Sequence, residues 1–152
     1  MSDPNAAKAR AVGINHVAIE VDDIGEALEF YGKLLDFTVE EQTQDMAIIY
    51  LGDQFINFIR NSDRKPDTMR HFGIAVDDKP LARRTLEAMG VKLIDSRFLD
   101  FLDPWGNRVE ITTYANIQYT KTDHVLRGMG LGHLKKSDEA LAELRAKGMA
   151  PR

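Results

Sequence analysis

The sequence predicts an α+β fold built from two modules with the same element order, β-α-β-β-β, and a C-terminal extension. Segment 16–23 reads HVAIEVDD and segment 71–78 reads HFGIAVDD, so the pattern H-x-x-I-x-V-D-D recurs at an offset of 55 residues. The segments after the two copies also agree in kind, because in each a stretch with helical periodicity precedes three strand-like runs. A repeat that keeps its order in this way favours an internal duplication.

The first module begins with the strand-like run 16–23. The following stretch, 24–37, places Ile24, Leu28, Tyr31 and Leu35 on one stripe of a helix. Three further strands are predicted at 37–41, 45–51 and 54–60, and the pair Gly52-Asp53 marks a turn between the last two. The acidic pair Asp22 and Asp23 is typical of a strand exit that caps the next helix.

The second module repeats this order from residue 71. Its helix is predicted over 79–91, with Pro80 in the first turn and Gly90 at the C-terminal cap. Strands follow at 91–94, 97–103 and 107–114, and the segment D-P-W-G at 103–106 is a turn in which Trp105 suits a turn or an interface. The polar segment 61–69 links the two modules.

Residues 115–152 form an extension that packs on the duplicated part or on a second copy. A short helix is predicted over 137–149, with Ser137 as N-cap and Gly148 just after the C-terminus. The segment 114–136 has no clear hydrophobic period. His124 and His133 lie in this region and are expected at the surface.

Composition excludes several classes of protein. The chain has 152 residues, 43% of them hydrophobic and 29% charged, which is enough to bury a core without cross-links. The net charge of −4 argues against a nucleic-acid partner and gives no reason to expect a membrane partner. Because there is no cysteine, disulfide scaffolds, thiolate metal sites and cysteine nucleophiles are excluded.

No targeting segment is visible in residues 1–12, which we expect to be a disordered polar start. No run approaches the roughly 18 apolar residues of a membrane span. The absence of cysteine fits a reducing compartment, so the expected location is the cytoplasm.

The alternation of side chains along the strands places both repeat histidines on one type of face. His16 and His71 lie opposite the bulky aliphatic residues that a helix must cover, next to small residues such as Ala18 and Gly73. Glu110, in the last strand of the second module, points the same way, and Asn57 is its counterpart in the first module. If the modules pair about an approximate two-fold axis, these four side chains converge in a concave cavity.

Three motifs carry a resemblance to a known family: H-x-x-I-x-V-D-D, E-F-Y-x-K-L-L-D-F and D-P-W-G-N-x-V-E-I. In this order and spacing, over residues 13–114, they resemble the glyoxalase/bleomycin resistance/extradiol dioxygenase group, the vicinal oxygen chelate superfamily. The resemblance implies paired βαβββ modules that form a curved, barrel-like sheet around a divalent metal. Module one would span 13–60 and module two 70–114. Carried over by position, the metal ligands would be His16, His71 and Glu110, with Asn57 at a fourth corner.

Two imidazoles and one carboxylate suit a divalent ion such as Fe, Mn, Ni, Co or Zn. Such a centre has open positions for two adjacent oxygens of a small substrate and stabilises an anion that forms there. Dioxygenase-like and lyase- or isomerase-like chemistry both fit this arrangement. Glu110 is the residue expected to serve catalysis through the metal. Asn57 is a poor general base, because an amide does not titrate.

Two alternatives remain open within the same resemblance. One is a fosfomycin-resistance thiol transferase, which also uses two histidines and a glutamate, although Ala18 stands where that branch resembles H-x-T. The other is a metal-free protein of the bleomycin-resistance type that sequesters a drug. The linker is only nine residues long, so the modules pair within one chain or between chains. We expect a homodimer that acts on a small-molecule substrate.

Overall fold

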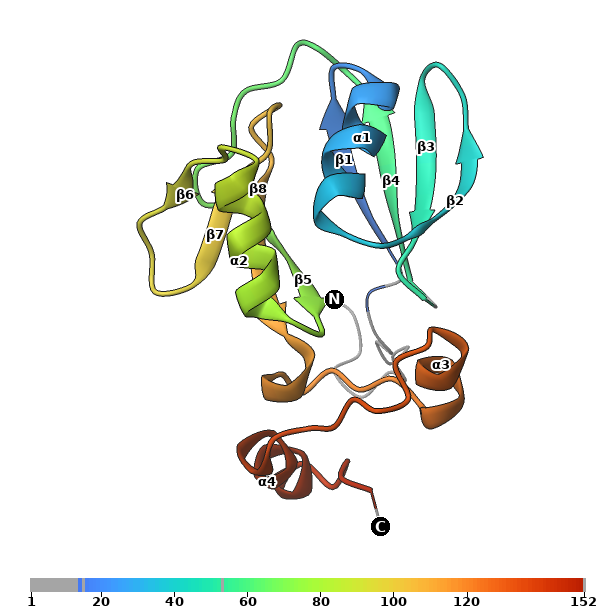
Figure 1. Ribbon diagram of the computed structural model, residues 1–152, viewed down its shortest axis with the longest axis vertical. Coiled ribbons are helices and arrows are strands. Elements are labelled where there is room, and N and C mark those ends of the chain that lie inside the picture. Colours follow the sequence, from blue (N-terminus) through green and yellow to red (C-terminus); the bar gives the residue numbers. More distant parts are fainter. Residues whose placement is uncertain (1–13, 15, 53, 152) are drawn as a thin grey trace, which may run out of the picture.

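Two four-stranded mixed sheets, one in each module, form the body of the protein (Figure 1). The computed structural model describes residues 14, 16–52 and 54–151. The expected disordered start, residues 1–12, lies outside the described residues. The order of strands is β1-β4-β3-β2 in the first sheet and β5-β8-β7-β6 in the second, so the two modules have the same topology. The predicted duplication and the α+β class are therefore confirmed.

The elements of the first module follow the predicted order. They are β1 (His16–Val21), α1 (Ile24–Leu34), β2 (Thr38–Gln42), β3 (Met46–Tyr50) and β4 (Phe55–Arg60). β1 pairs with β4 in parallel, with Ala18 opposite Asn57, and the other neighbours are antiparallel. The side chain of Asp23 accepts a hydrogen bond from the Glu26 amide at 2.9 Å, so the predicted cap fixes where α1 begins.

The second module repeats this arrangement. It comprises β5 (Phe72–Val76), α2 (Lys79–Ala88), β6 (Leu93–Ile94), β7 (Leu99–Leu102) and β8 (Arg108–Thr113). β5 pairs with β8 in parallel, with Gly73 opposite Glu110, just as Ala18 lies opposite Asn57 in the first module. Asp78 caps α2 by accepting from the Leu81 amide at 2.9 Å. The first strand after the helix is only two residues long, shorter than the predicted run 91–94.

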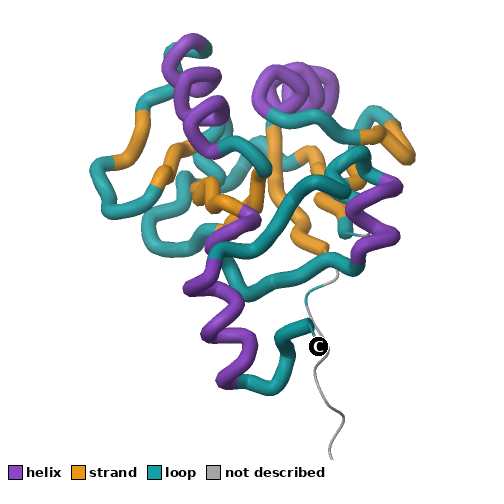
Figure 2. The backbone as a smooth tube through the Cα atoms, turned by 60° about the horizontal axis from the view of Figure 1, so that its bottom comes forward, coloured by secondary structure: helices purple, strands orange, loops and turns teal. Residues whose placement is uncertain are grey.

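Both long helices cover the same side of the strands (Figure 2). A single buried cluster runs beneath them through both modules, and its largest fully buried side chains include Tyr31, Phe58, Phe101, Ile49, Leu86 and Leu99. Phe58 stacks on Tyr31, with ring centroids 5.1 Å apart. Trp105 is buried in the same cluster and meets Phe30 of α1 edge-on, so it is an interface residue between the modules.

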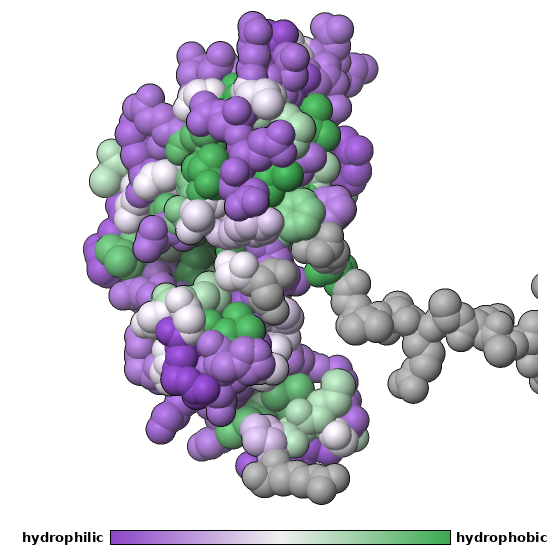
Figure 3. All heavy atoms as spheres, turned by 90° about the vertical axis from the view of Figure 1, so that its right-hand side faces the viewer, coloured by the Kyte–Doolittle hydropathy of each residue, from purple (hydrophilic) through white to green (hydrophobic). Residues whose placement is uncertain are grey.

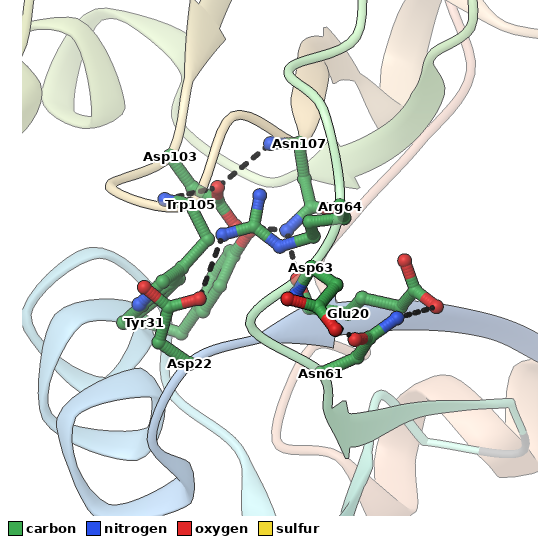
Figure 4. A network of polar contacts seen from close by, with 9 residues as sticks. All are labelled: Glu20, Asp22, Tyr31, Asn61, Asp63, Arg64, Asp103, Trp105 and Asn107. Atoms are coloured by element: carbon green, nitrogen blue, oxygen red, sulfur yellow. Dashed lines mark hydrogen bonds and ion pairs between the residues drawn. The ribbon is translucent and has the colours of Figure 1, made fainter.

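A polar junction joins the modules at the C-terminal end of β1 (Figure 4). The buried carboxylate of Asp103 accepts from the Tyr31 hydroxyl at 2.8 Å, and it also accepts from the amide nitrogens of Trp105 and Asn107. Asn107 Nδ2 donates to the backbone oxygen of Glu20 at 2.7 Å. The turn D-P-W-G-N of module two therefore locks onto the first strand and helix of module one.

The C-terminal extension lies at the lower end of both modules in Figure 1. It contains a short 3-10 helix (Tyr114–Asn116), α3 (Asp123–Gly128) and α4 (Asp138–Ala146). The Ser137 hydroxyl caps α4 by accepting from the Ala140 amide, as the sequence predicts. α3 was not predicted, because its six residues are too few to show a helical period. In Figure 3, apolar side chains reach the surface of the extension among hydrophilic ones.

Within the part of the chain that the structure describes, no helix combines the length and the apolar composition needed to cross a bilayer.

Candidate metal centre

His71 and Glu110 form the closest pair of predicted ligands. His71 immediately precedes β5, Glu110 lies in β8, and the parallel pairing of these strands brings the two side chains to the same face. His71 Nε2 is 3.7 Å from Glu110 Oε2. The imidazole is 43% exposed and the carboxylate 17%, so the pair lies at a surface that a small molecule can reach.

The tautomer of His71 is set by a neighbouring backbone group. His71 Nδ1 is 2.9 Å from the backbone oxygen of Met69. A carbonyl oxygen only accepts, so Nδ1 carries the proton and, in the neutral ring, Nε2 presents its lone pair toward Glu110. Histidine ligands of metals are usually oriented by such a bond from the second ring nitrogen. A lone pair and a carboxylate oxygen that face each other fit a shared divalent ion.

A cavity of about 560 Å³, which we call the central groove, contains this pair. Its walls come from the start of β1, the start of β4, most of β5 and parts of β8 and the extension; they include His16, Phe55, His71, Gly73, Glu110, Thr112 and Tyr119. The imidazole of His16 stacks on Phe55 with ring centroids 4.5 Å apart and planes 5° apart. The three predicted ligands therefore line the same groove.

The described residues of a single chain nevertheless contain no set of three or more histidine, cysteine, aspartate or glutamate side chains placed to hold one metal ion. The modules touch at the C-terminal end of β1, through Glu20, whereas His16 begins that strand. Since a strand rises about 3.3 Å per residue, His16 lies roughly 13 Å further along it. One chain thus brings His71 and Glu110 close together, and His16 lines the same groove without completing a three-residue ligand set.

Asn57 occupies the position in β4 that Glu110 occupies in β8. It pairs in register with Ala18 of β1, on the same face as His16 and Phe55. Its amide oxygen is buried and has no hydrogen-bond partner among the described residues. An unpaired buried amide oxygen costs free energy. Asn57, the predicted fourth corner of the metal site, therefore offers a hydrogen-bond acceptor to a group outside the described residues.

The sequence analysis missed a second carboxylate next to Glu110. Asp100 of β7 stands directly opposite Glu110 in the antiparallel register and is only 1% exposed. Arg108 neutralises it, because the guanidinium Nε and Nη2 atoms lie 3.0 and 2.5 Å from Asp100 Oδ2. The sequence F-L-D-F-L-D at 98–103 could have revealed Asp100, because side chains alternate along a strand. Leu99 and Phe101 face the core, so Asp100 between them faces the concave side. Because Arg108 balances the charge of Asp100, the negative charge of Glu110 is left to attract a metal cation.

Comparison with known proteins places the chain in a family. A sequence profile of the "Glyoxalase/Bleomycin resistance protein/Dioxygenase superfamily" matches residues 13–111. The metallothiol transferase FosB of Bacillus licheniformis is 25% identical over 143 residues, which cover 83% of this chain and 93% of that protein.

Solved structures show the same fold at low sequence identity. The fosfomycin resistance protein FosX of Listeria monocytogenes superposes with a TM-score of 0.58 at 14% identity, covering 66% of this chain and 90% of that one. Virulence protein STM3117 of Salmonella typhimurium gives 0.55 at 19% identity, covering 70% and 99%. The profile match includes both repeats and the strand that bears Glu110, and the paired-module topology agrees with it. The chain therefore belongs to the glyoxalase/bleomycin resistance protein/dioxygenase superfamily.

Proposed function

We propose that this protein is a metal-dependent enzyme that binds vicinal oxygens of a small substrate in the central groove. The observation that supports this best is the His71–Glu110 pair, whose lone pair and carboxylate face each other at 3.7 Å. A divalent ion held there would supply Lewis-acid chemistry, polarising substrate oxygens and stabilising negative charge. Dioxygenase-like and lyase- or isomerase-like reactions both use that chemistry.

The residues of the chain itself have separate roles in this proposal. His71 and Glu110 hold the ion, and Met69 orients the imidazole through its backbone oxygen. Glu110 would serve catalysis as a carboxylate that holds the ion. Arg108 compensates the buried charge of Asp100, so that Glu110 remains available to the ion.

The third ligand in this proposal is His16 of the partner subunit in a homodimer. Within one chain, the described residues complete no three-residue ligand set around the pair. A second copy, related by a two-fold axis, would supply its own His16 to each pair and create two equivalent sites. Asn57 would lie beside the same site as a hydrogen-bond acceptor.

Metal binding by the purified protein tests the proposal. Titration with Mn²⁺, Ni²⁺ and Zn²⁺ is expected to give one ion per chain. His71→Ala and Glu110→Ala should each weaken binding at least tenfold without unfolding the protein. His133→Ala is the matched control, because His133 is exposed in the extension. A wild-type protein that binds none of these ions, or variants that bind as tightly as wild type, would refute the proposed site.

A mixing experiment tests the shared site. His16→Ala and Glu110→Ala are each expected to bind metal poorly alone. After they are unfolded together and refolded, half of the dimers contain both chains, and one of the two sites in each is intact. About a quarter of wild-type sites should therefore return. If no sites return, the ligands come from one chain and the dimeric assignment is wrong.

Thiol transfer is a second candidate function, and the similarity to FosB over most of the chain favours it. The test is incubation of the metal-loaded protein with fosfomycin and a low-molecular-weight thiol, followed by mass spectrometry. A thiol adduct that requires Glu110 would assign this activity. Absence of the adduct with an intact metal site would leave the oxygen-chelating reactions as the function.

A further inference from the structure

The extension bridges the two modules at one end of the central groove. It continues directly from β8 of module two, where the Ser137 amide donates to the Ala115 oxygen at 2.8 Å. On the other side it reaches the β3–β4 turn of module one, since a Cβ built on Gly52 would lie 2.5 Å from Met129 Sδ. Figure 1 shows α3 below module one and the whole extension across the lower end of both modules.

A lysine fixes the segment that faces the groove. Lys136 Nζ donates to the backbone oxygens of Tyr114 at 2.6 Å and Ile117 at 2.8 Å, and it also donates to that of Tyr119. The same ammonium lies 3.6 Å from the centroid of the Tyr114 ring. The turn that presents Tyr119 is therefore held from within the extension.

Behind Tyr119 lies a second cavity of about 330 Å³, which we call the end chamber. Its walls are the ends of α1 and β5, the start of α2 and the extension, and most are aliphatic; they include Leu34, Val76, Leu81, Leu126, Leu131 and Leu134. The chamber has the size of a small-ligand site. It adjoins the central groove, because Leu51, Gln54, Gly73, Ile74, Ala75 and Tyr119 line both.

The charges around the chamber restrict what enters it. Asp36, Asp77 and Asp78 line it, against one lysine, Lys121. An anionic group would therefore be repelled, whereas an uncharged apolar group gains by leaving water. The superfamily profile ends at residue 111, so the walls that the extension contributes lie outside the matched region.

We infer that the end chamber selects the substrate by accepting its uncharged apolar arm, while the oxygen-bearing end lies in the central groove at His71 and Glu110. This inference rests on the proposed function only for the position of the substrate's oxygen-bearing end at His71 and Glu110. The substrate class is a small amphipathic molecule with adjacent oxygens at one end and an aromatic or aliphatic group at the other. Tyr119 and Leu81 are specificity-determining residues, because Tyr119 lines both cavities and Leu81 lines the chamber.

Binding of three probes to the full-length, Zn²⁺-loaded protein without oxygen tests the inference. Catechol carries only the adjacent oxygens, and 4-butylcatechol adds an apolar arm. Calorimetry should show at least tenfold tighter binding of 4-butylcatechol, since its four-carbon arm leaves water when it enters the chamber. 3-(3,4-Dihydroxyphenyl)propanoate, which has a charged arm, should bind no more tightly than catechol.

Leu81→Trp fills the chamber from a residue that is 51% exposed, so the fold should tolerate it. The preference for 4-butylcatechol should fall to within twofold, with Zn²⁺ affinity unchanged. Leu81→Glu, at the favourable third position of α2, should have the same effect. Val39→Trp is the control, because Val39 is similarly exposed on β2 and lines neither cavity.

The outcomes separate the two proposals. Equal binding of catechol and 4-butylcatechol by wild type would overturn the inference, and so would a preference that survives in both Leu81 variants or tighter binding of the charged arm. Zn²⁺ binding that depends on His71 would still support the proposed function in each of those cases. If Zn²⁺ does not bind but EDTA-treated protein prefers 4-butylcatechol and loses this preference in Leu81→Trp, the proposed function fails and the chamber is upheld.

Discussion

The hydroxyl of Tyr31 donates a 2.8 Å hydrogen bond to Oδ2 of Asp103, although 72 positions of sequence separate the two residues. Both side chains are buried, and each belongs to a different module. Burial raises the pKa of Asp103 above its ordinary value and raises that of Tyr31 well above its own. The bond therefore joins the modules in a place from which water is excluded.

Tyr31→Phe should lower the free energy of unfolding by about 1 to 3 kcal/mol, because a buried carboxylate loses one of its donors. Tyr50→Phe removes the same hydroxyl from a residue that is 37% exposed, and it should change stability by less than about 0.5 kcal/mol. Urea unfolding of the metal-free proteins measures both. Equal losses in the two variants would show that the junction contributes little.

Gly106→Ala should lower the free energy of unfolding more than Gly90→Ala, although both glycines have a positive φ, 85° and 71°. A Cβ on Gly106 would lie 2.7 Å from Cα of Pro66 in the linker, whereas one on Gly90 meets nothing within 4 Å. The left-handed backbone alone costs about 1 to 2 kcal/mol, and the clash should add about 1 to 3 kcal/mol. Thermal unfolding of the pair gives the difference, and similar melting temperatures would argue against the close approach of linker and turn.

Arg108→Leu should destabilise the protein by about 3 to 5 kcal/mol, because it leaves Asp100 as an uncompensated buried charge. The double variant Asp100→Leu, Arg108→Leu removes the charge together with its partner and should recover most of this loss. Denaturant unfolding of the single and double variants measures the coupling. A double variant less stable than Arg108→Leu would mean that Asp100 is stabilised by other contacts.

Lys136 should make the protein more stable as the pH rises from about 8 to about 10. Burial lowers the pKa of Lys136 from its ordinary value to about 8. Between about 8 and the value of roughly 10.4 for an unfolded lysine, the unfolded chain binds a proton that the folded chain has released. The free energy of unfolding therefore increases with pH across this window.

The matched variant for this effect is Lys136→Met, which should be less stable than wild type at every pH. Its upward slope between pH 8 and 10 should be shallower but not absent, because burial also lowers the pKa of Lys121. Tyrosine titration, including that of Tyr31, is common to both proteins and cancels in the difference. Parallel stability curves for the two proteins would contradict the assignment of the slope to Lys136.

The sequence was sufficient to predict those features of the fold that depend on residues close together in the chain. The acidic residues Asp23 and Asp78 mark where both helices begin, and strand alternation places His71 and Glu110 on one face. The sequence was insufficient to predict which side chains on different strands come close enough to share a ligand or an ion pair. Alternation predicts which face His16 occupies, but it does not predict that the described residues of one chain form no three-residue ligand set. The partnership of Asp100 with Arg108 was missed for a similar reason, since it spans two strands.

The walls of the end chamber also escaped prediction. The segment that precedes Ser137 lacks a hydrophobic period because its residues serve a turn and a cavity rather than one helical face. Tyr119 and Met129 take their positions from contacts with Lys136 and Gly52, which a linear pattern does not reveal.

The junction at Asp103, beside the C-terminal end of β1, and the extension held by Lys136 lie at opposite ends of the two modules (Figure 1). Substitutions in the extension can therefore reshape the walls of the end chamber while the contacts that hold the two modules together stay unchanged.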